Sequence, residues 1–213
     1  VNVVVLDKTP TAADTVASEE RASAIRQRIV DGEDFTDVAT AESSDQATAP
    51  AGGDLGVFVK NYMTPPFDSA VFAAPIGQVV GPVQSSFGFH VLEVQDRWAA
   101  DSAQARHILV NIERTDDSEI ELLTMADSLE DLGEAMSLNQ AAAAAGLTAT
   151  TMDIAQNFPF VPGAGQVSEG SDWLFEEASQ GEVSPVFETS TAFYSIELIS
   201  SEPEGVLPLA DEI

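Results

Sequence analysis

The chain has 213 residues, which is enough for one large domain or two modest domains that each bury a hydrophobic core. Thirty-six acidic residues stand against eight basic residues, and the formal net charge is −28. Because proteins that bind nucleic acid or anionic membrane surfaces need Lys and Arg to neutralise phosphates, this balance argues against both kinds of partner.

Two interpretations of the acidity remain open from composition alone. The acidic residues can form a solvated surface suited to high salt, or they can attract basic unfolded clients. Attraction between opposite charges weakens as ionic strength rises, so a salt titration of client binding separates the two interpretations.

The chain contains no cysteine, which excludes disulfide bonds and thiolate chemistry and fits an oxidising compartment. The sequence shows no signal peptide and no apolar run long enough to span a membrane. It opens within the β-branched run 1–6 and stops within 208–213, which resembles the start of a helix. We therefore expect a fragment of a longer protein.

The first half of the chain predicts the element order β-α-α-β-α-β-β. Gly32 ends the first helix, and Asp34 is a favourable N-cap for the second helix. The expected elements are a strand at 1–6, a helix at 12–30, a helix from about 34 to 43–45, a strand at 55–59, a helix at 66–73, and strands at 79–84 and 89–96.

The most informative stretch begins with the turn Gly52–Gly56 and ends in the strand that His90 opens. Met63, Phe67 and Phe72 are spaced through a short loop and helix, where they can line one concave apolar surface. The closing strand has an alternating pattern, so His90 is placed to face that surface.

The order and spacing of these residues resemble the parvulin family of peptidyl-prolyl isomerases over roughly residues 1–97. The resemblance implies a catalytic pair and a set of substrate-binding residues that form a cup for the proline ring. The catalytic pair is His90 and Asp45, and the substrate-binding residues are Leu55, Met63, Phe67 and, packed behind the cup, Phe72.

Each of these residues also has a purely structural interpretation. Leu55, Phe67 and Phe72 can be ordinary core residues. Asp45 can cap a turn, and His90 can be a buried histidine bound to a backbone carbonyl. The joint spacing favours the functional interpretation, and a methionine in a loop, such as Met63, fits an adaptable binding wall.

A repeat with an offset of 104 residues indicates a second unit. The corresponding pairs are Val3 with His107, His90 with Tyr194, and Glu93 with Glu197. The second unit has expected helices at 117–136 and 138–145, and an aromatic, proline-rich loop at 157–165 in place of the Gly-Gly turn.

The predicted fold class is therefore α+β, with two tandem parvulin-like units, each an antiparallel sheet wrapped by helices, and with the second unit degenerate. The expected boundaries are 1–97 for the isomerase-like unit, 98–103 for a linker, 104–201 for the degenerate unit and 202–213 for the start of a truncated segment.

Neither predicted unit keeps the full set of parvulin polar residues. The family usually has a second histidine on its first strand, where the repeat places Val3. The second unit has His107 on its first strand, but Tyr194 replaces the closing histidine. We therefore expect the first unit to be weakly active or to bind without turnover. We expect the second unit to be silent, with His107 a structural remnant. On this interpretation Val3 lies beside His90, and Val3→His raises activity.

The resemblance extends to the extracytoplasmic region of bacterial foldases of the PpiD type and, more loosely, to the SurA and PrsA chaperones. It implies a peptidyl-prolyl isomerase that acts on unfolded or proline-containing polypeptide clients outside the cytoplasm. The alternative is a chaperone that holds such segments in the same groove without turnover. We expect no cofactor and no metal, since two histidines without cysteine make a zinc site improbable. A membrane anchor is expected outside this fragment, and the sequence leaves the oligomeric state open.

Overall fold

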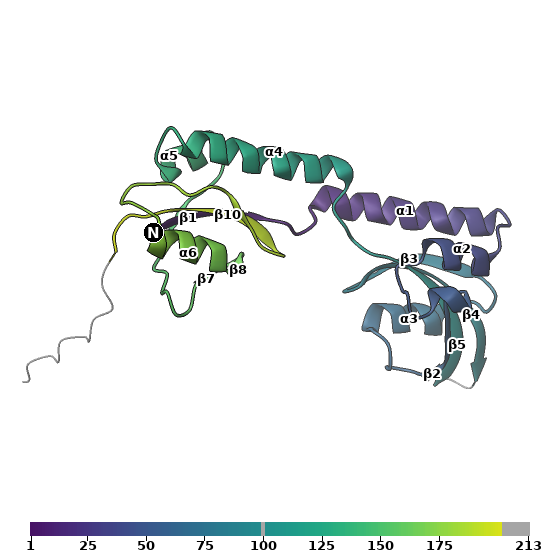
Figure 1. Cartoon of the computed structure of the whole chain (residues 1–213). Coiled ribbons are helices and arrows are strands. Elements are labelled where there is room, and N and C mark those ends of the chain that lie inside the picture. Colours follow the sequence, from purple (N-terminus) through teal and green to yellow (C-terminus); the bar gives the residue numbers. More distant parts are fainter. Residues whose placement is uncertain (99–100, 202–213) are drawn as a thin grey trace, which may run out of the picture. The chain divides into compact units, whose positions relative to one another are not determined.

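In the computed structural model, which describes residues 1–98 and 101–201, the chain has an α+β fold with antiparallel sheets (Figure 1). It divides into two compact units. One unit is a single stretch, Pro10–Thr115, and we call it the continuous unit. The other combines Val1–Thr9 with the chain from Asp116 onward, and we call it the split unit.

The continuous unit contains a four-stranded sheet in the order β2-β5-β4-β3. Its elements are α1 (Ala12–Val30), α2 (Phe35–Glu42), the short 3-10 helix η1 (Ala49–Ala51), β2 (Asp54–Val59), α3 (Pro65–Ala73), β3 (Val79–Ser85), β4 (Gly88–Trp98) and β5 (Ser102–Val110).

The helices of this unit begin where local hydrogen bonding dictates. Thr11 and Asp14 form a capping box at the start of α1, each side chain accepting a hydrogen bond from the backbone N–H of the other residue. Asp34 accepts hydrogen bonds from two backbone N–H groups at the start of α2, as its position in the sequence predicts.

The sheet of the continuous unit is covered on both faces. On one face, Val91 and Ile108 pack in one core cluster with Ile25 of α1 and Phe35 of α2. On the other face, β4 and β5 pack against α3. The buried residues of that second cluster are Phe58, Phe67, Val71, Ala74, Leu92, Val94, Ala103 and Ala105.

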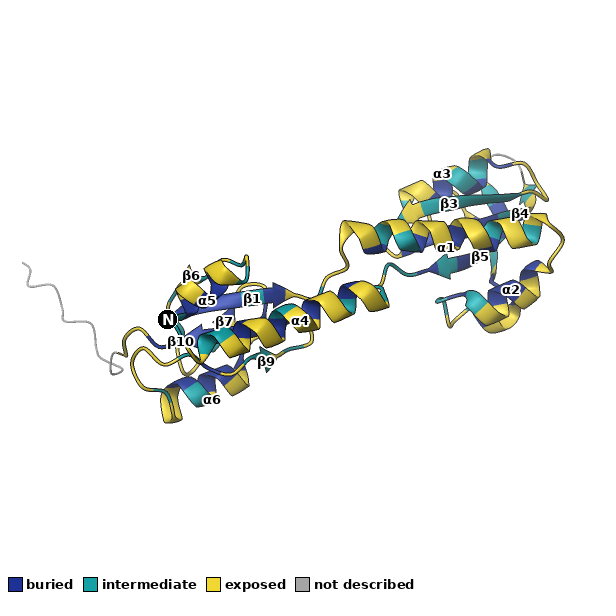
Figure 2. Ribbon diagram, turned by 90° about the horizontal axis from the view of Figure 1, so that it is seen from above, coloured by how far each residue is buried: buried dark blue, intermediate teal, exposed yellow. Residues whose placement is uncertain are grey.

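The split unit has a sheet in the order β6-β1-β10-β9 and a separate hairpin of β7 and β8. Its elements are β1 (Asn2–Asp7), α4 (Asp116–Gly133), α5 (Leu138–Ala144), β6 (Thr150–Thr151), β7 (Phe160–Val161), β8 (Gly165–Gln166), α6 (Ser168–Glu176), β9 (Phe187–Glu188) and β10 (Ala192–Glu197). Along α4 in Figure 2, buried residues recur among exposed ones, as in a helix with one face in a core, whereas β1 is mostly buried.

The partners of the two first strands differ from the prediction. β1 pairs with β10 of the split unit, with Val3 opposite Ile196. β5 pairs with β4 of the continuous unit, with His107 opposite Leu92. The expectation that Val3 lies next to His90 is therefore wrong.

The two strands have exchanged places without a change of register. Val3 and His107 are 104 positions apart, and so are their respective partners Ile196 and Leu92, taken in the opposite order. β1 therefore pairs with β10 in the same register in which β5 pairs with β4. Each of the two strands joins the sheet that the prediction assigned to the other. The aligned stretches 3–6 and 107–110 share one burial pattern, in which only the third residue is half-buried, so this pattern does not decide which sheet each strand joins.

The boundaries of the units differ from the expected ones for the same reason. The segment 98–103, expected as a linker, includes the end of β4 and the start of β5, which pair with each other. The expected unit 104–201 loses its first strand to the continuous unit. The expected terminal segment 202–213 lies outside the described residues. No helix within 1–98 or 101–201 combines the length and the apolar character needed to span a bilayer.

Candidate active site

The continuous unit contains a cavity of about 370 Å³ between the sheet and the loop that precedes α3. Most of its wall is apolar, and its ionisable groups include two histidines and one carboxylate. The lining residues are Asp45, Leu55, Tyr62, Met63, Thr64, Phe67, Phe87, His90, His107 and Leu109.

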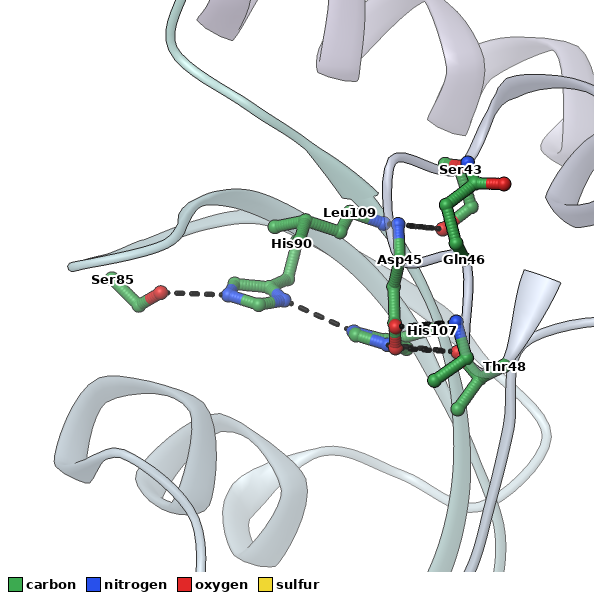
Figure 3. A network of polar contacts seen from close by, with 9 residues as sticks. Ser43, Asp45, Gln46, Thr48, Ser85, His90, His107 and Leu109 are labelled. Carbon is green, nitrogen blue, oxygen red and sulfur yellow. Dashed lines mark hydrogen bonds and ion pairs between the residues drawn. The ribbon is translucent and has the colours of Figure 1, made fainter.

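A row of hydrogen-bonded side chains runs along one wall of the cavity (Figure 3). Ser85 Oγ lies 2.7 Å from His90 Nε2, and His90 Nδ1 lies 3.1 Å from His107 Nδ1. His107 Nε2 lies 2.8 Å from Asp45 Oδ2, which also accepts a hydrogen bond from the Thr48 hydroxyl at 2.6 Å.

The chemistry of the partners assigns the protons in this row. An ionised Asp45 only accepts hydrogen bonds, so His107 Nε2 carries a proton. When His107 is neutral, its Nδ1 is an acceptor and His90 Nδ1 donates to it. His90 Nε2 then accepts from the Ser85 hydroxyl. Every ring nitrogen of the two imidazoles therefore has a partner within the protein.

The environment keeps His90 neutral and Asp45 ionised. Burial, followed by the nearby charge of His107, lowers the pKa of His90 to about 4. Burial also opposes ionisation of Asp45. Hydrogen bonds from Thr48, from His107 and from the Ala47 backbone outweigh that effect and hold the pKa of Asp45 below its ordinary value.

Asp45 is positioned by the strand that carries His107. Just after α2 ends, Ser44 N donates to the Leu109 carbonyl at 2.8 Å, and Leu109 N donates to Ser43 Oγ at 3.1 Å. These bonds attach the loop to β5. They bring the Asp45 carboxylate over the same face of the sheet as the His107 ring.

Phe67 contacts both histidines and also forms part of the apolar wall of the cavity. The Phe67 ring lies edge-on to both imidazoles, with centroid distances of 5.0 Å to His90 and 5.7 Å to His107. Its residue is only 3% exposed. Phe67 is thus both a buried core residue and part of the cavity wall. A structural role in the core is therefore compatible with a position in the cup.

A loop with an unusual backbone conformation brings Met63 to the cavity. Asn61 has a positive φ of 67°, and its N–H donates to the carboxylate of Asp68 at 2.7 Å. Asp68 is buried in the first turn of α3, which Pro65 and Pro66 begin. This bond fixes the loop 61–64 against the helix.

The structure brings together five of the six predicted site residues in one cavity. Phe72 lies outside the lining and packs, half-buried, in the cluster that contains Phe67 and Val71. That position matches an aromatic residue behind the cup.

Sequence reasoning missed several residues of this site, above all His107. The interpretation of His107 as a remnant in the second unit is wrong, because β5 places it against His90. The signal was present in the run Arg106–Val110, which was identified as a first strand. The assumption that each sheet takes its strands in chain order assigned it to the wrong sheet. Ser85 and Thr48 gave no sequence signal beyond that of ordinary turn residues.

No group of three or more histidine or acidic side chains arranged as metal ligands occurs in the described part of the chain. The carboxylate and the imidazoles of the site bond to one another, so the arrangement holds Asp45, His107 and His90 against an apolar cup.

Comparison with known families finds one domain match. Residues 3–96 match a family model described as "Rotamase: PPIC-type PPIASE domain". The match includes Asp45, the cup and His90, and it ends before β5. His107 therefore lies outside the matched range, although it completes the cavity.

Similar bacterial proteins include a foldase and a chaperone. Foldase protein PrsA of Oceanobacillus iheyensis is 42% identical over 79 residues, which cover 37% of this chain and 26% of that protein. Chaperone SurA of Nitrosococcus oceani is 43% identical over 89 residues, covering 40% and 21%. The crystal structure of PrsA from Bacillus anthracis is 21% identical, with a TM-score of 0.32 and coverage of 72% and 62%. The matches span about a quarter of the length of these curated relatives.

Proposed function

We propose that this chain, which carries a PPIC-type peptidyl-prolyl isomerase domain of the parvulin family, is a foldase that catalyses rotation about X–Pro bonds in unfolded polypeptides. The observation that carries the proposal is the cavity of the continuous unit. It joins a cup large enough for a proline ring to an ionised carboxylate that is bound by His107, with the neutral His90 beside it.

The reaction needs no bond to be made or broken between heavy atoms. The barrier to rotation is about 18–20 kcal/mol because the planar amide loses its resonance when it twists. An enzyme accelerates the rotation by binding the twisted amide more tightly than the planar one. Shape and fixed charge are sufficient for this purpose.

The cavity offers both. Leu55, Met63 and Phe67 form an apolar cup that holds the pyrrolidine ring while the preceding residue rotates. In a planar amide the carbonyl oxygen carries partial negative charge, and twisting reduces that charge. A carboxylate beside the carbonyl therefore disfavours the planar form, and we assign this role to Asp45.

His90 and His107 hold this arrangement in place. All four of their ring nitrogens are engaged within the protein, which leaves none to attack the substrate or to exchange a proton with it. Their contribution is to keep Asp45 ionised and oriented and to form the floor on which Phe67 packs.

The test is exchange spectroscopy by NMR on a short peptide with one X–Pro bond. Asp45→Asn removes the charge but keeps the shape, so we expect kcat/KM to fall by about 10²-fold with little change in peptide affinity. Turnover by Asp45→Asn equal to that of the unmodified protein removes the electrostatic role. No exchange with the unmodified protein removes the isomerase function.

A second function, that of a holding chaperone, is favoured by the exposed aromatic rings of Tyr62 and Phe87 at the cavity. These rings offer apolar contact to a peptide whether or not its proline isomerises. Peptide binding without exchange in the same NMR experiment identifies this function. In either case we propose unfolded extracytoplasmic proteins as clients.

A further inference from the structure

Strand β2 forms an open edge of the sheet in the continuous unit. It pairs with β5 on one side, and no strand within the described residues pairs with its other side (Figure 1). An open strand edge presents unpaired backbone groups, and natural proteins usually protect such edges with charged residues, Pro or bulges. β2 has a register irregularity between Asp54 and Val57, but the segment Val57–Val59 that follows it pairs regularly and contains neither a charge nor a proline.

The hydrogen-bond pattern shows which groups face the open edge. Just beyond the paired residues Val59 and Ser102, Lys60 N donates to the carbonyl of Asp101, which directly precedes β5, at 2.7 Å. Because inward and outward residues alternate along an antiparallel strand, the N–H groups of Val57 and Val59 point away from β5. The Val59 carbonyl already accepts from Tyr62 N. Two donors and the carbonyl of Val57 therefore remain for a partner strand.

The side chains beside this edge are apolar and uncovered. Val57 is 62% exposed and Val59 is 59% exposed. The register aligns Val59 with Ser102 on β5 and with Trp98 on β4, which is 44% exposed. These three residues lie in one row across the sheet, with the small Ser102 between the two apolar side chains.

The charges around this face are negative. Asp54, Asp96 and Asp101 are exposed at its border. Of the nearby cations, Arg106 is paired with Glu93, and the Lys60 ammonium lies over the ring of Phe72. A ligand that complements this face is apolar and positively charged.

We propose that the open edge of β2 is a strand-addition site for an extended, apolar and basic segment of the client whose proline occupies the cavity. The same strand carries Leu55 into the cavity wall and Val57 and Val59 onto the exposed face. A segment paired with β2 alternates its side chains between these two faces. The client is taken from the proposed function, but the binding site rests on the geometry of β2.

The test compares two matched double variants. Val57→Lys with Val59→Lys places two cations on the open edge. Val16→Lys with Val30→Lys adds the same charge to α1, at valines that are 53% and 54% exposed. Each protein is assayed with a short peptide that contains one X–Pro bond and with a longer peptide that extends the same core by alternating Val and Lys.

We expect the β2 variant to weaken binding of the longer peptide by about tenfold or more, because the edge cations block pairing and repel the peptide. Turnover of the short peptide should stay within about twofold, since the cavity is unchanged. The α1 variant should bind both peptides as the unmodified protein does. An equal loss in both variants overturns the proposal.

Amide hydrogen exchange gives a second, direct measurement. Saturation with the longer peptide should slow exchange at the Val57 and Val59 N–H groups, which face the open edge. Unchanged exchange at both positions overturns strand addition. So does slowed exchange that depends on protein concentration without peptide, because a second copy of the chain then covers the edge.

The two proposals fail in different ways. Absence of short-peptide turnover by the unmodified protein contradicts the isomerase function only. Unchanged amide exchange on binding of the longer peptide contradicts strand addition only.

Discussion

The continuous and split units carry different side chains at equivalent positions of the closing strand and of the helix before it. The closing strand carries His90 in one unit and Tyr194 in the other, 104 residues later. The preceding helices, α3 and α6, each have nine residues, and their third residues are Phe67 and Gly170. A large aromatic on the helix thus meets an imidazole on the sheet, whereas a glycine on the helix meets a tyrosine.

The tyrosine occupies space that the cup needs. Gly170 N donates to the Tyr194 hydroxyl at 3.0 Å, and a Cβ atom at position 170 would lie 2.7 Å from the Tyr194 ring. In the continuous unit the corresponding region holds Phe67 beside the cavity. We therefore expect the split unit to be catalytically silent because its own side chain fills the site.

A turn is common to both units. Gly77 has φ of 73° and donates to the Val94 carbonyl at 2.8 Å, and Gly181 has φ of 84° and donates to the Leu198 carbonyl at 2.7 Å. Val94 and Leu198 are again 104 residues apart. These agreements support a repeat, while the origin of the split unit as a degenerate parvulin copy stays a prediction. The comparison teaches that a few side chains decide whether such a sheet carries an open cup.

The largest effect on stability is expected from removing Phe67, the aromatic side chain whose place on the helix is taken by Gly170 in the split unit. Phe67→Ala should destabilise the continuous unit by about 3–5 kcal/mol, because it leaves a cavity in a buried cluster. It should also abolish binding of proline peptides. Urea denaturation with a probe in each unit measures the loss. Phe72→Ala, behind the cup, is the control that should retain peptide binding.

Exchanging the first-strand residues tests which unit needs the histidine. His107→Val should lower kcat/KM by about 10²-fold, since Asp45 and His90 each lose a partner. Val3→His should leave turnover unchanged and destabilise the split unit by about 1–3 kcal/mol, because it buries an imidazole without a designated partner. Increased turnover in Val3→His would show that β1 joins the sheet of the continuous unit.

A methyl group at position 170 tests the close contact between α6 and the Tyr194 ring. Gly170→Ala should destabilise that unit by about 1–3 kcal/mol, because the new methyl group meets the Tyr194 ring. Ser168→Ala, at an exposed position of the same helix, is the control and should change little. Equal melting temperatures for the two variants would contradict the close contact.

The pH dependence of stability should also differ between the units. Both histidines belong to the continuous unit. The pKa of His90 falls from 6.5 to about 4 on folding, so the unfolded chain binds the proton more readily. The contribution of His90 is therefore fully present above pH 6.5 and is lost as the pH falls toward 4. Denaturation curves of the unmodified protein and of His90→Gln across this range measure it. A similar slope in both would contradict the assignment.

The smallest effect is expected from salt. The split unit contains 21 acidic residues and one basic residue, against 15 and seven in the continuous unit. Screening of repulsion should therefore raise the melting temperature of the split unit more than that of the continuous unit. Scans in dilute buffer and in molar salt, with a probe in each unit, test this difference.

Local features of the sequence determined most of the elements and most of the cup. The N-cap residue Asp34 marked a helix start that the structure confirms. The spacing of Met63, Phe67 and Phe72 indicated a common apolar surface; Met63 and Phe67 line the cavity, whereas Phe72 packs outside its lining. Such signals are readable because they depend on neighbours within a few residues of each other.

Only the tertiary structure decided which first strand each sheet receives. Strand pairing joins residues far apart in sequence, and β1 and β5 share one burial pattern at equivalent register positions. Neither strand has a local feature that favours one sheet over the other. The position of His107 beside His90 follows from that pairing. The polar half of the candidate site therefore depended on a long-range choice that periodicity does not encode.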